Sequence, residues 1–178
     1  MIIISCLGNP GAQYRRNRHN IGFIIGSYLS THWKIPVSKN SFSSLYGTGT
    51  IESRDICIIL PQTYMNNSGQ SVKKALDYFR TDPSSLIVIH DEIELDFGVY
   101  KTKFGGGHKG QNGIRSIIEH LGTPDFHRLR FGVGRSPVPQ VSVADYVLSD
   151  FSEIELEQVQ LMLPEIANTI QTLFRSIE

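Results

Sequence analysis

Two kinds of hydrophobic pattern alternate along the chain. Short, nearly continuous apolar runs are typical of buried strands, whereas apolar residues three and four positions apart indicate helices with one buried face. The runs that predict strands lie at 2–6, 46–52, 56–60, 86–89, 99–103 and 129–133, the second and third being joined by a loop at 53–55. The spacing that predicts helices covers 21–29, 72–79, 114–121 and 159–177. Pro164 lies inside the last helix and should break or kink it.

Strands that alternate with helices imply an α/β fold with a largely parallel or mixed sheet. The 178 residues contain no internal repeat and no convincing linker. A chain of this length can bury a sizeable core without disulfides or metals. We therefore expect a single domain that spans residues 1–178.

Composition excludes several classes of protein. Hydrophobic residues make up 40% and charged residues 19%, which is ordinary for a globular chain and excludes a disordered one. No segment approaches the ~20 apolar residues of a membrane span, and the N-terminus lacks the charged region of a signal peptide. Cys6 and Cys57 lie in apolar runs, as buried thiols of a reducing compartment do. We expect a cytoplasmic protein.

The net charge of zero hides an uneven distribution. Residues 1–100 carry nine Lys or Arg and eight acids (+1), residues 101–135 carry seven and two (+5), and residues 136–178 carry one and seven (−6). A local basic face binds a polyanion even when the whole chain is neutral. The alternative is that these charges are scattered over a solvated surface.

Polar residues follow three of the predicted strands, and a fourth polar cluster opens a helix. They are Asn9, the segment 61–67, the triplet His90-Asp91-Glu92, and the glycine-rich segment 105–113. Ligands of open α/β sheets bind outside the carboxyl ends of the strands. If the strands are parallel, all four clusters meet at one edge of the sheet.

Each cluster also has a simpler interpretation. Asn9 suits a turn, Asn66 and Asn67 suit helix N-caps, Asp91 suits a capped turn, and the glycines suit a flexible surface loop. Glycines that lead into a helix N-terminus also expose backbone N–H groups, which suit phosphate or carboxylate binding. The segment matches neither the P-loop nor the dinucleotide-binding pattern.

His19 is the histidine with the strongest chemical interest. It precedes an apolar helix, where the helix dipole should keep the imidazole neutral and able to act as a general base. No nucleophile elbow is present, and both cysteines lie inside predicted strands, so covalent catalysis has little support. The pair His90-Asp91 lacks the further ligands at defined spacing that a metal site requires.

Five motifs, in this order, resemble bacterial-type peptidyl-tRNA hydrolases over essentially the whole chain. The motifs are Leu7-Gly8-Asn9-Pro10-Gly11 with Tyr14 and Arg18-His19-Asn20-Ile21-Gly22, Pro61-Gln62-Thr63-Tyr64-Met65-Asn66, His90-Asp91-Glu92, 105–113, and 126–135. The resemblance implies a single α/β domain with a mixed twisted sheet, usually a monomer without metal or cofactor. It also implies cleavage of the ester between a stalled peptide and the 3′ ribose of its tRNA.

The resemblance assigns roles to particular residues. His19 matches the catalytic histidine and Asp91 its partner carboxylate, while Tyr14 and Met65 match positions that line the cleft. The remaining matches are the site asparagines Asn9, Asn66 and Asn112 and the phosphate-binding residues Lys103 and Arg130. These residue types suit the reaction, because a base activates water, amides stabilise an oxyanion, and cations hold RNA phosphates.

Two positions depart from the common family pattern. Gln111 stands where many members have histidine, so any acid–base role there is absent, and Lys109 replaces a residue that is commonly small. Two other functions stay open: a catalytically inactive RNA-binding protein of the same fold, and a metal-dependent phosphohydrolase built on His90, Asp91 and His108.

Overall fold

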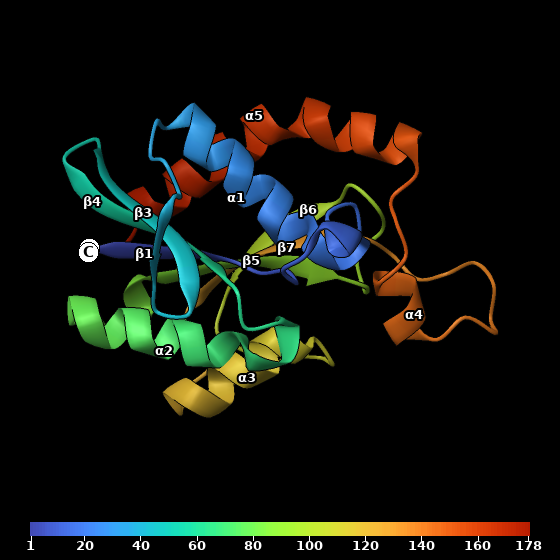
Figure 1. Cartoon of the computed structure of the whole chain (residues 1–178), viewed down its shortest axis with the longest axis horizontal. Helices are drawn as coiled ribbons and strands as arrows, with labels where there is room; N and C mark the ends of the chain where they lie inside the picture. The colour runs from blue at the N-terminus through green and yellow to red at the C-terminus, as the bar shows by residue number, and fades with distance from the viewer.

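The computed structural model describes all residues, 1–178, and contains one sheet of seven strands. The sheet order is β2-β3-β4-β1-β5-β7-β6 (Figure 1). The strands are β1 (Ile2–Cys6), β2 (Lys39–Ser41), β3 (Ser44–Ile51), β4 (Arg54–Pro61), β5 (Leu86–Glu92), β6 (Tyr100–Phe104) and β7 (His127–Gly132). Neighbours among β4, β1, β5 and β7 pair in parallel, whereas β2, β3 and β6 pair antiparallel. The predicted α/β fold with a mixed sheet is confirmed.

Helices cover both faces of the sheet. In Figure 1, α1 (Ile21–His32) and α5 (Glu153–Arg175) lie on one face, and α2 (Ser68–Phe79) and α3 (Asn112–Leu121) lie on the other. Because successive strand residues point to opposite faces, Ile2 and Ile4 of β1 pack in the core under α1 and α5. Ile3 packs in the second core under α2 and α3. Both faces of the central strands are apolar, which explains their continuous hydrophobic runs.

The structure corrects the predicted β3–β4 connection and adds two elements. Strands β3 and β4 extend to a two-residue turn at Glu52 and Ser53, both with positive φ, instead of a loop at 53–55. The short strand β2 is fully exposed, and α4 (Val143–Val147) is a single short helix. Neither presents enough regularly spaced buried residues to leave a hydrophobic pattern.

Helix α5 passes through Pro164 without a break. Pro164 is exposed, on the side of the helix away from the core, and the helix bends near its middle (Figure 1). A capping box formed by Ser152 and Glu155 starts the helix. The kink is therefore observed and the break is not, because burial of the apolar face holds the two halves together.

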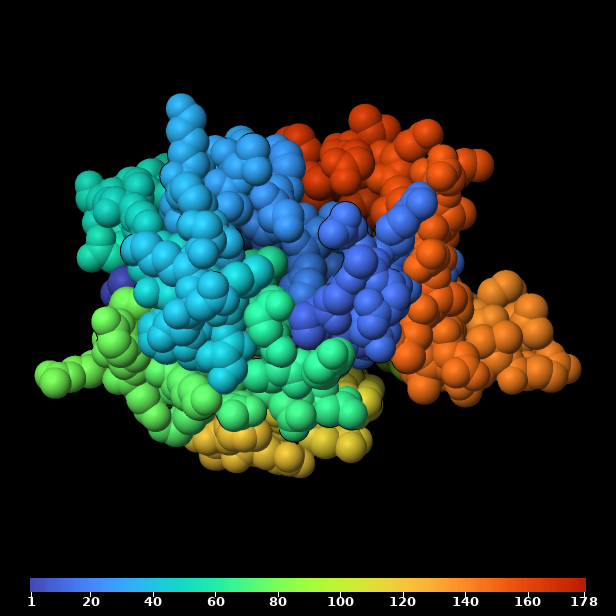
Figure 2. Space-filling model, viewed as in Figure 1, coloured from blue at the N-terminus to red at the C-terminus, as the bar shows by residue number.

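The parallel arrangement brings the carboxyl ends of β1, β4 and β5 to one edge of the sheet. The segment that contains α4 projects beside this edge and appears in orange in Figure 2. It lies against the N-terminal turns of the chain, where Asn17 forms a bridge with Asp150. None of the helices combines the length and the hydrophobicity that a membrane-spanning segment needs.

Candidate active site

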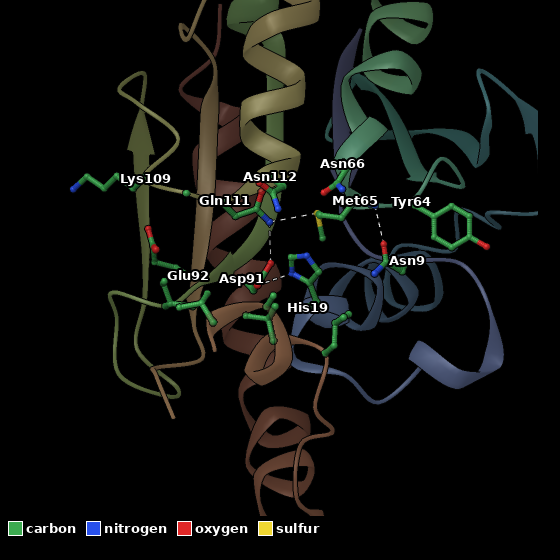
Figure 3. A pocket seen from close by; sticks show the side chains of 16 residues that line it. Asn9, His19, Tyr64, Met65, Asn66, Asp91, Glu92, Lys109, Gln111 and Asn112 are labelled. Carbon is green, nitrogen blue, oxygen red and sulfur yellow. Dashed lines mark hydrogen bonds and ion pairs between the residues drawn. The ribbon is translucent and has the colours of Figure 1, made fainter. Parts of the chain in front are cut away.

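A cleft of about 470 Å³ lies at the carboxyl edge of the sheet. Side chains from all four predicted polar clusters line it (Figure 3). Val143 and Val147 of α4 close one side. The sequence-based expectation that the four clusters meet at one edge is confirmed. The acidic C-terminal segment contributes in two ways, since α4 borders the cleft while α5 packs on the sheet.

His19 and Asp91 form a hydrogen-bonded pair inside the cleft. His19 Nδ1 lies 2.8 Å from Asp91 Oδ2. An ionised carboxylate only accepts hydrogen bonds, so in the neutral imidazole Nδ1 carries the proton and Nε2 is left bare. The Asp91 side chain is 3% exposed and the His19 side chain 11%. The bare nitrogen is therefore the atom of this pair that can take a proton from water.

The pKa of His19 is shifted in the opposite direction from the sequence-based expectation. Burial lowers the pKa of His19, but the charge of Asp91 and the hydrogen bond to it outweigh burial and raise it above 6.5. His19 lies in a short 3-10 turn before α1, so the dipole of α1 does not decide its charge. Burial opposes ionisation of Asp91, yet the same pairing with His19 lowers the pKa of Asp91.

Gln111 occupies the other side of the Asp91 carboxylate. Its Nε2 donates to Asp91 Oδ1 at 2.9 Å, and its Oε1 accepts from the backbone N–H of Ile114 at 2.8 Å. Gln111 is thus the N-cap of α3 and a hydrogen-bond partner of Asp91 at once. In the sequence, Gln111 stands out only as a departure from the family pattern. Its amide could have been recognised as a helix cap, but nothing in the sequence indicates the contact with Asp91.

Asn9 connects the segment after β1 to the segment after β4, so it does more than a simple turn residue would. Its Oδ1 accepts from the backbone N–H of Met65 at 2.7 Å. The buried Asn20 holds its backbone from the other side, with Asn20 Oδ1 accepting from Asn9 N and Asn20 Nδ2 donating to Asn9 O, both at 2.9 Å. The Asn9 Nδ2 group has no partner and lines the cleft. It is free to donate to a bound substrate.

Asn66 and Asn112 complete the set of amides around His19 (Figure 3). Both side chains are exposed to the cleft, and Asn112 is the first residue of α3. Of the two asparagines that suited helix N-caps, Asn67 occupies the N-cap of α2 without a side-chain cap hydrogen bond, whereas Asn66 lies one residue earlier and lines the cleft. The cleft therefore presents three neutral amide groups to whatever lies beside His19 Nε2.

Met65 lines the cleft as predicted, whereas Tyr14 does not. Tyr14 instead packs edge-on against Tyr64, with ring centroids 6.4 Å apart. Tyr64 forms the cleft rim, is 53% exposed, and has φ of 61°, a conformation that strains a bulky residue. Strain of this kind arises from tertiary packing, so the sequence gives no signal for it.

The glycine-rich segment is held by Arg128, not left free. Arg128 donates to the carbonyl oxygens of Gly106 and Gly107 at 2.6 and 2.7 Å, and to Pro124 O at 3.2 Å. Its guanidinium also stacks over Phe126. The flexible-loop interpretation is wrong for this half of the segment, because a buried cation fixes its carbonyl groups.

A basic group of side chains extends from the cleft across β6 and β7. Lys103 lies opposite Arg128 and Lys101 lies opposite Arg130, so all four share one face of this antiparallel pair. Partial burial, with repulsion from Lys109, Arg128 and Arg130, lowers the pKa of Lys103. Arg130 Nη1 lies 3.7 Å from Glu92 Oε1, and Glu92 lines the cleft. The basic group therefore begins at the cleft rim.

The structure brings no metal-binding group of side chains together. No three His, Cys, Asp or Glu residues are arranged to hold a metal ion. His90 Nδ1 is hydrogen-bonded to the backbone carbonyl oxygen of Asp91, and His108 Nδ1 accepts from the backbone N–H of Gly110. The site that the metal-dependent alternative requires is not formed by these residues.

The fold and the site together define an α/β protein with a His–Asp pair, a ring of neutral amides and an adjoining basic face. A family model described as peptidyl-tRNA hydrolase matches residues 3–178. The peptidyl-tRNA hydrolase of Bacillus subtilis (strain 168) is 41% identical over 160 residues, which cover 90% of this chain and 85% of the relative. The Syntrophotalea carbinolica enzyme is 41% identical over 175 residues, which cover 98% and 91%.

Solved structures agree with these relatives. The crystal structure of peptidyl-tRNA hydrolase from Acinetobacter baumannii has a TM-score of 0.91 to this chain at 36% identity, covering 98% of this chain and 89% of that one. The chain belongs to the peptidyl-tRNA hydrolase family.

Proposed function

We propose that this chain hydrolyses the ester bond between a peptide, or an N-blocked amino acid, and the 3′ ribose of tRNA. The observation that carries the proposal is the His19–Asp91 pair, whose bare imidazole nitrogen faces a cleft lined by three asparagines. The basic group on β6 and β7 adjoins the same cleft. Peptide chemistry and RNA binding are thereby placed side by side, as the substrate requires.

His19 Nε2 takes a proton from a water molecule as the water oxygen attacks the ester carbonyl carbon. The carbonyl oxygen becomes an oxyanion, and neutral amide N–H groups in the cleft stabilise it. When the tetrahedral intermediate collapses, the bond to the ribose 3′ oxygen breaks and the proton on His19 passes to that oxygen. The products are a free 3′ hydroxyl and a carboxylic acid, which loses its proton to water at neutral pH.

Asp91 supports each of these steps. It holds the imidazole in the tautomer whose Nε2 is free, and its negative charge stabilises the imidazolium that forms. Because the pKa of His19 is raised, the neutral base becomes populated only as the pH rises through that pKa. Catalysis should therefore increase with pH on the acid side of the profile.

The roles of the remaining side chains follow from what they offer. Asn9, Asn66 and Asn112 present amide donors and acceptors that fit any peptide backbone, so the site need not recognise side chains. Lys103 and Arg130 offer charges to RNA phosphates, an interaction that weakens with salt. As part of the proposal the enzyme is cytoplasmic, because translation supplies its substrate there, and it is a monomer, as the family resemblance implies.

The test is the release of N-acetylated amino acid from N-acetyl-aminoacyl-tRNA, measured for the wild type and His19→Ala with and without EDTA. The proposal expects EDTA-insensitive release by the wild type and loss of turnover in the variant, with tRNA binding retained. Absence of release by folded wild-type protein would favour the inactive RNA-binding alternative. Activity lost only in EDTA would favour the metal-dependent alternative.

A further inference from the structure

We propose that Gln111 is a positioning residue for the reaction, because it fixes the Asp91 carboxylate from the side opposite His19. The inference rests on the proposed function, since it assigns a role within the same site. Gln111 is 9% exposed and belongs to the wall of the cleft.

The two Asp91 oxygens have one side-chain donor each. Oδ2 receives the hydrogen bond from His19 Nδ1 at 2.8 Å, and Oδ1 receives the bond from Gln111 Nε2 at 2.9 Å (Figure 3). The terminal torsion of an aspartate side chain is soft, so one hydrogen bond leaves the carboxylate plane free to turn. Two donors on opposite oxygens fix the plane, and with it the direction in which the His19 ring points.

Gln111 is itself held in one orientation. Its Oε1 accepts from the N–H of Ile114 in the first turn of α3, so the amide cannot exchange its oxygen and nitrogen without losing the helix cap. Its Nε2 also lies 3.4 Å from Met65 Sδ. Gly113 completes the close packing, because a Cβ there would lie 2.6 Å from the same sulfur. The donor that faces Asp91 is therefore set by α3.

The amide has a chemical consequence that a titratable group would not have. It stays neutral at every pH, so it donates to Asp91 throughout the range in which His19 titrates. The hydrogen bond from Gln111 also contributes to the lowered pKa of Asp91. Asp91 thus stays ionised and ready to pair with the imidazolium form of His19.

The two functions of Gln111, helix cap and Asp91 donor, can be separated by substitution. Gln111→Ser keeps an oxygen at the N-cap, where serine is favoured, but is too short to reach Asp91. Gln111→Glu keeps both the length and the cap acceptor, but replaces the donor by a negative charge beside Asp91. Gln70, exposed on α2, is the matched control for both changes.

The experiment measures kcat, KM and the pH profile on N-acetyl-aminoacyl-tRNA, with thermal unfolding of each variant. A misaligned base costs on the order of 10²-fold in rate, so we expect kcat of Gln111→Ser to fall about tenfold to a hundredfold while KM stays within about twofold. In Gln111→Glu the added charge should move the acid limb to higher pH by about one unit. Gln70→Ser and Gln70→Glu should match the wild type.

An NMR measurement that does not depend on turnover compares the same Gln111 variants with the wild type. The His19 Nδ1 proton shared with a carboxylate should give a low-field NMR resonance, which we expect to weaken in Gln111→Ser. Wild-type kcat and an unmoved acid limb in both folded Gln111 variants would overturn the inference and leave Gln111 as a helix cap alone. Failure of the proposed function can be told apart from failure of this inference, because in the former case the wild type itself would release no product.

Discussion

Replacing Asp91 by asparagine tests the geometry of the site more sharply than any other single change. The substitution keeps the size of the side chain and removes its charge. Gln111 directs an N–H group at position 91, so the new amide should turn its oxygen toward Gln111 and its NH₂ group toward His19 Nδ1. Nδ1 must then accept, and the imidazole proton moves to Nε2. The variant would present a donor to the water instead of a base.

The magnitude follows from the lost charge as well as the lost tautomer. Two unit charges about 4 Å apart interact by about 4 kcal/mol at an effective dielectric of about 20. The imidazolium that forms in the transition state loses this stabilisation, because Asp91 is 2% exposed and water cannot replace it. At about 1.4 kcal/mol per tenfold change in rate, kcat should fall about 10³-fold.

The same variant should change the pH profile. In the wild type, kcat/KM should rise with pH through the raised pKa of His19, with a midpoint above 6.5, because the base must be neutral. In Asp91→Asn the carboxylate that raises the pKa of His19 is gone, and burial alone then lowers that pKa. The acid limb of the kcat/KM profile should therefore move to lower pH. The assay is release of N-acetylated amino acid between pH 5 and 9 on protein with wild-type circular dichroism. A kcat within about tenfold of wild type, or an acid limb that does not move, would refute the reasoning.

The remaining predictions concern RNA binding and stability. Lys103→Ala should raise KM and reduce the slope of log KM against log salt by about one, with Lys74→Ala on α2 as control; equal slopes would place the phosphates elsewhere. Arg130→Gln should act in the same direction, and unchanged KM would remove Arg130 from the RNA surface. Arg128→Met removes the donor to three carbonyl groups and should lower the free energy of unfolding by about 2–3 kcal/mol in urea titrations; an unchanged midpoint would show that the glycine-rich segment does not need it.

The arrangement of the core could be predicted from the sequence because burial leaves a regular pattern. The continuous apolar runs at Ile2–Cys6 and at the start of Leu86–Glu92 are readable as central strands, since both of their faces are covered. Elements with little buried surface left no such signal. The exposed strand Lys39–Ser41 and the short helix Val143–Val147 were missed for that reason.

The chemistry of the site divides in the same way. The resemblance to peptidyl-tRNA hydrolases was enough to single out His19, Asp91 and the asparagines, because the motifs that carry it are local stretches of sequence in a fixed order. The direction of the shift in the pKa of His19 was predicted wrongly, since it depends on Asp91, 72 positions away in the chain. The orientation of Asp91 depends in turn on Gln111, which the start of α3 holds in place.

The sequence by itself determined the α/β class, the strand ends that carry polar residues, and the residue types available for catalysis. Only the tertiary structure decided which of those groups touch. Tyr14 packs edge-on against Tyr64 and outside the cleft, while Gln111 lies against Asp91. The physical reason is that hydrophobic periodicity reports burial of each segment separately. Hydrogen bonds and pKa shifts depend on distances between segments, which only packing sets.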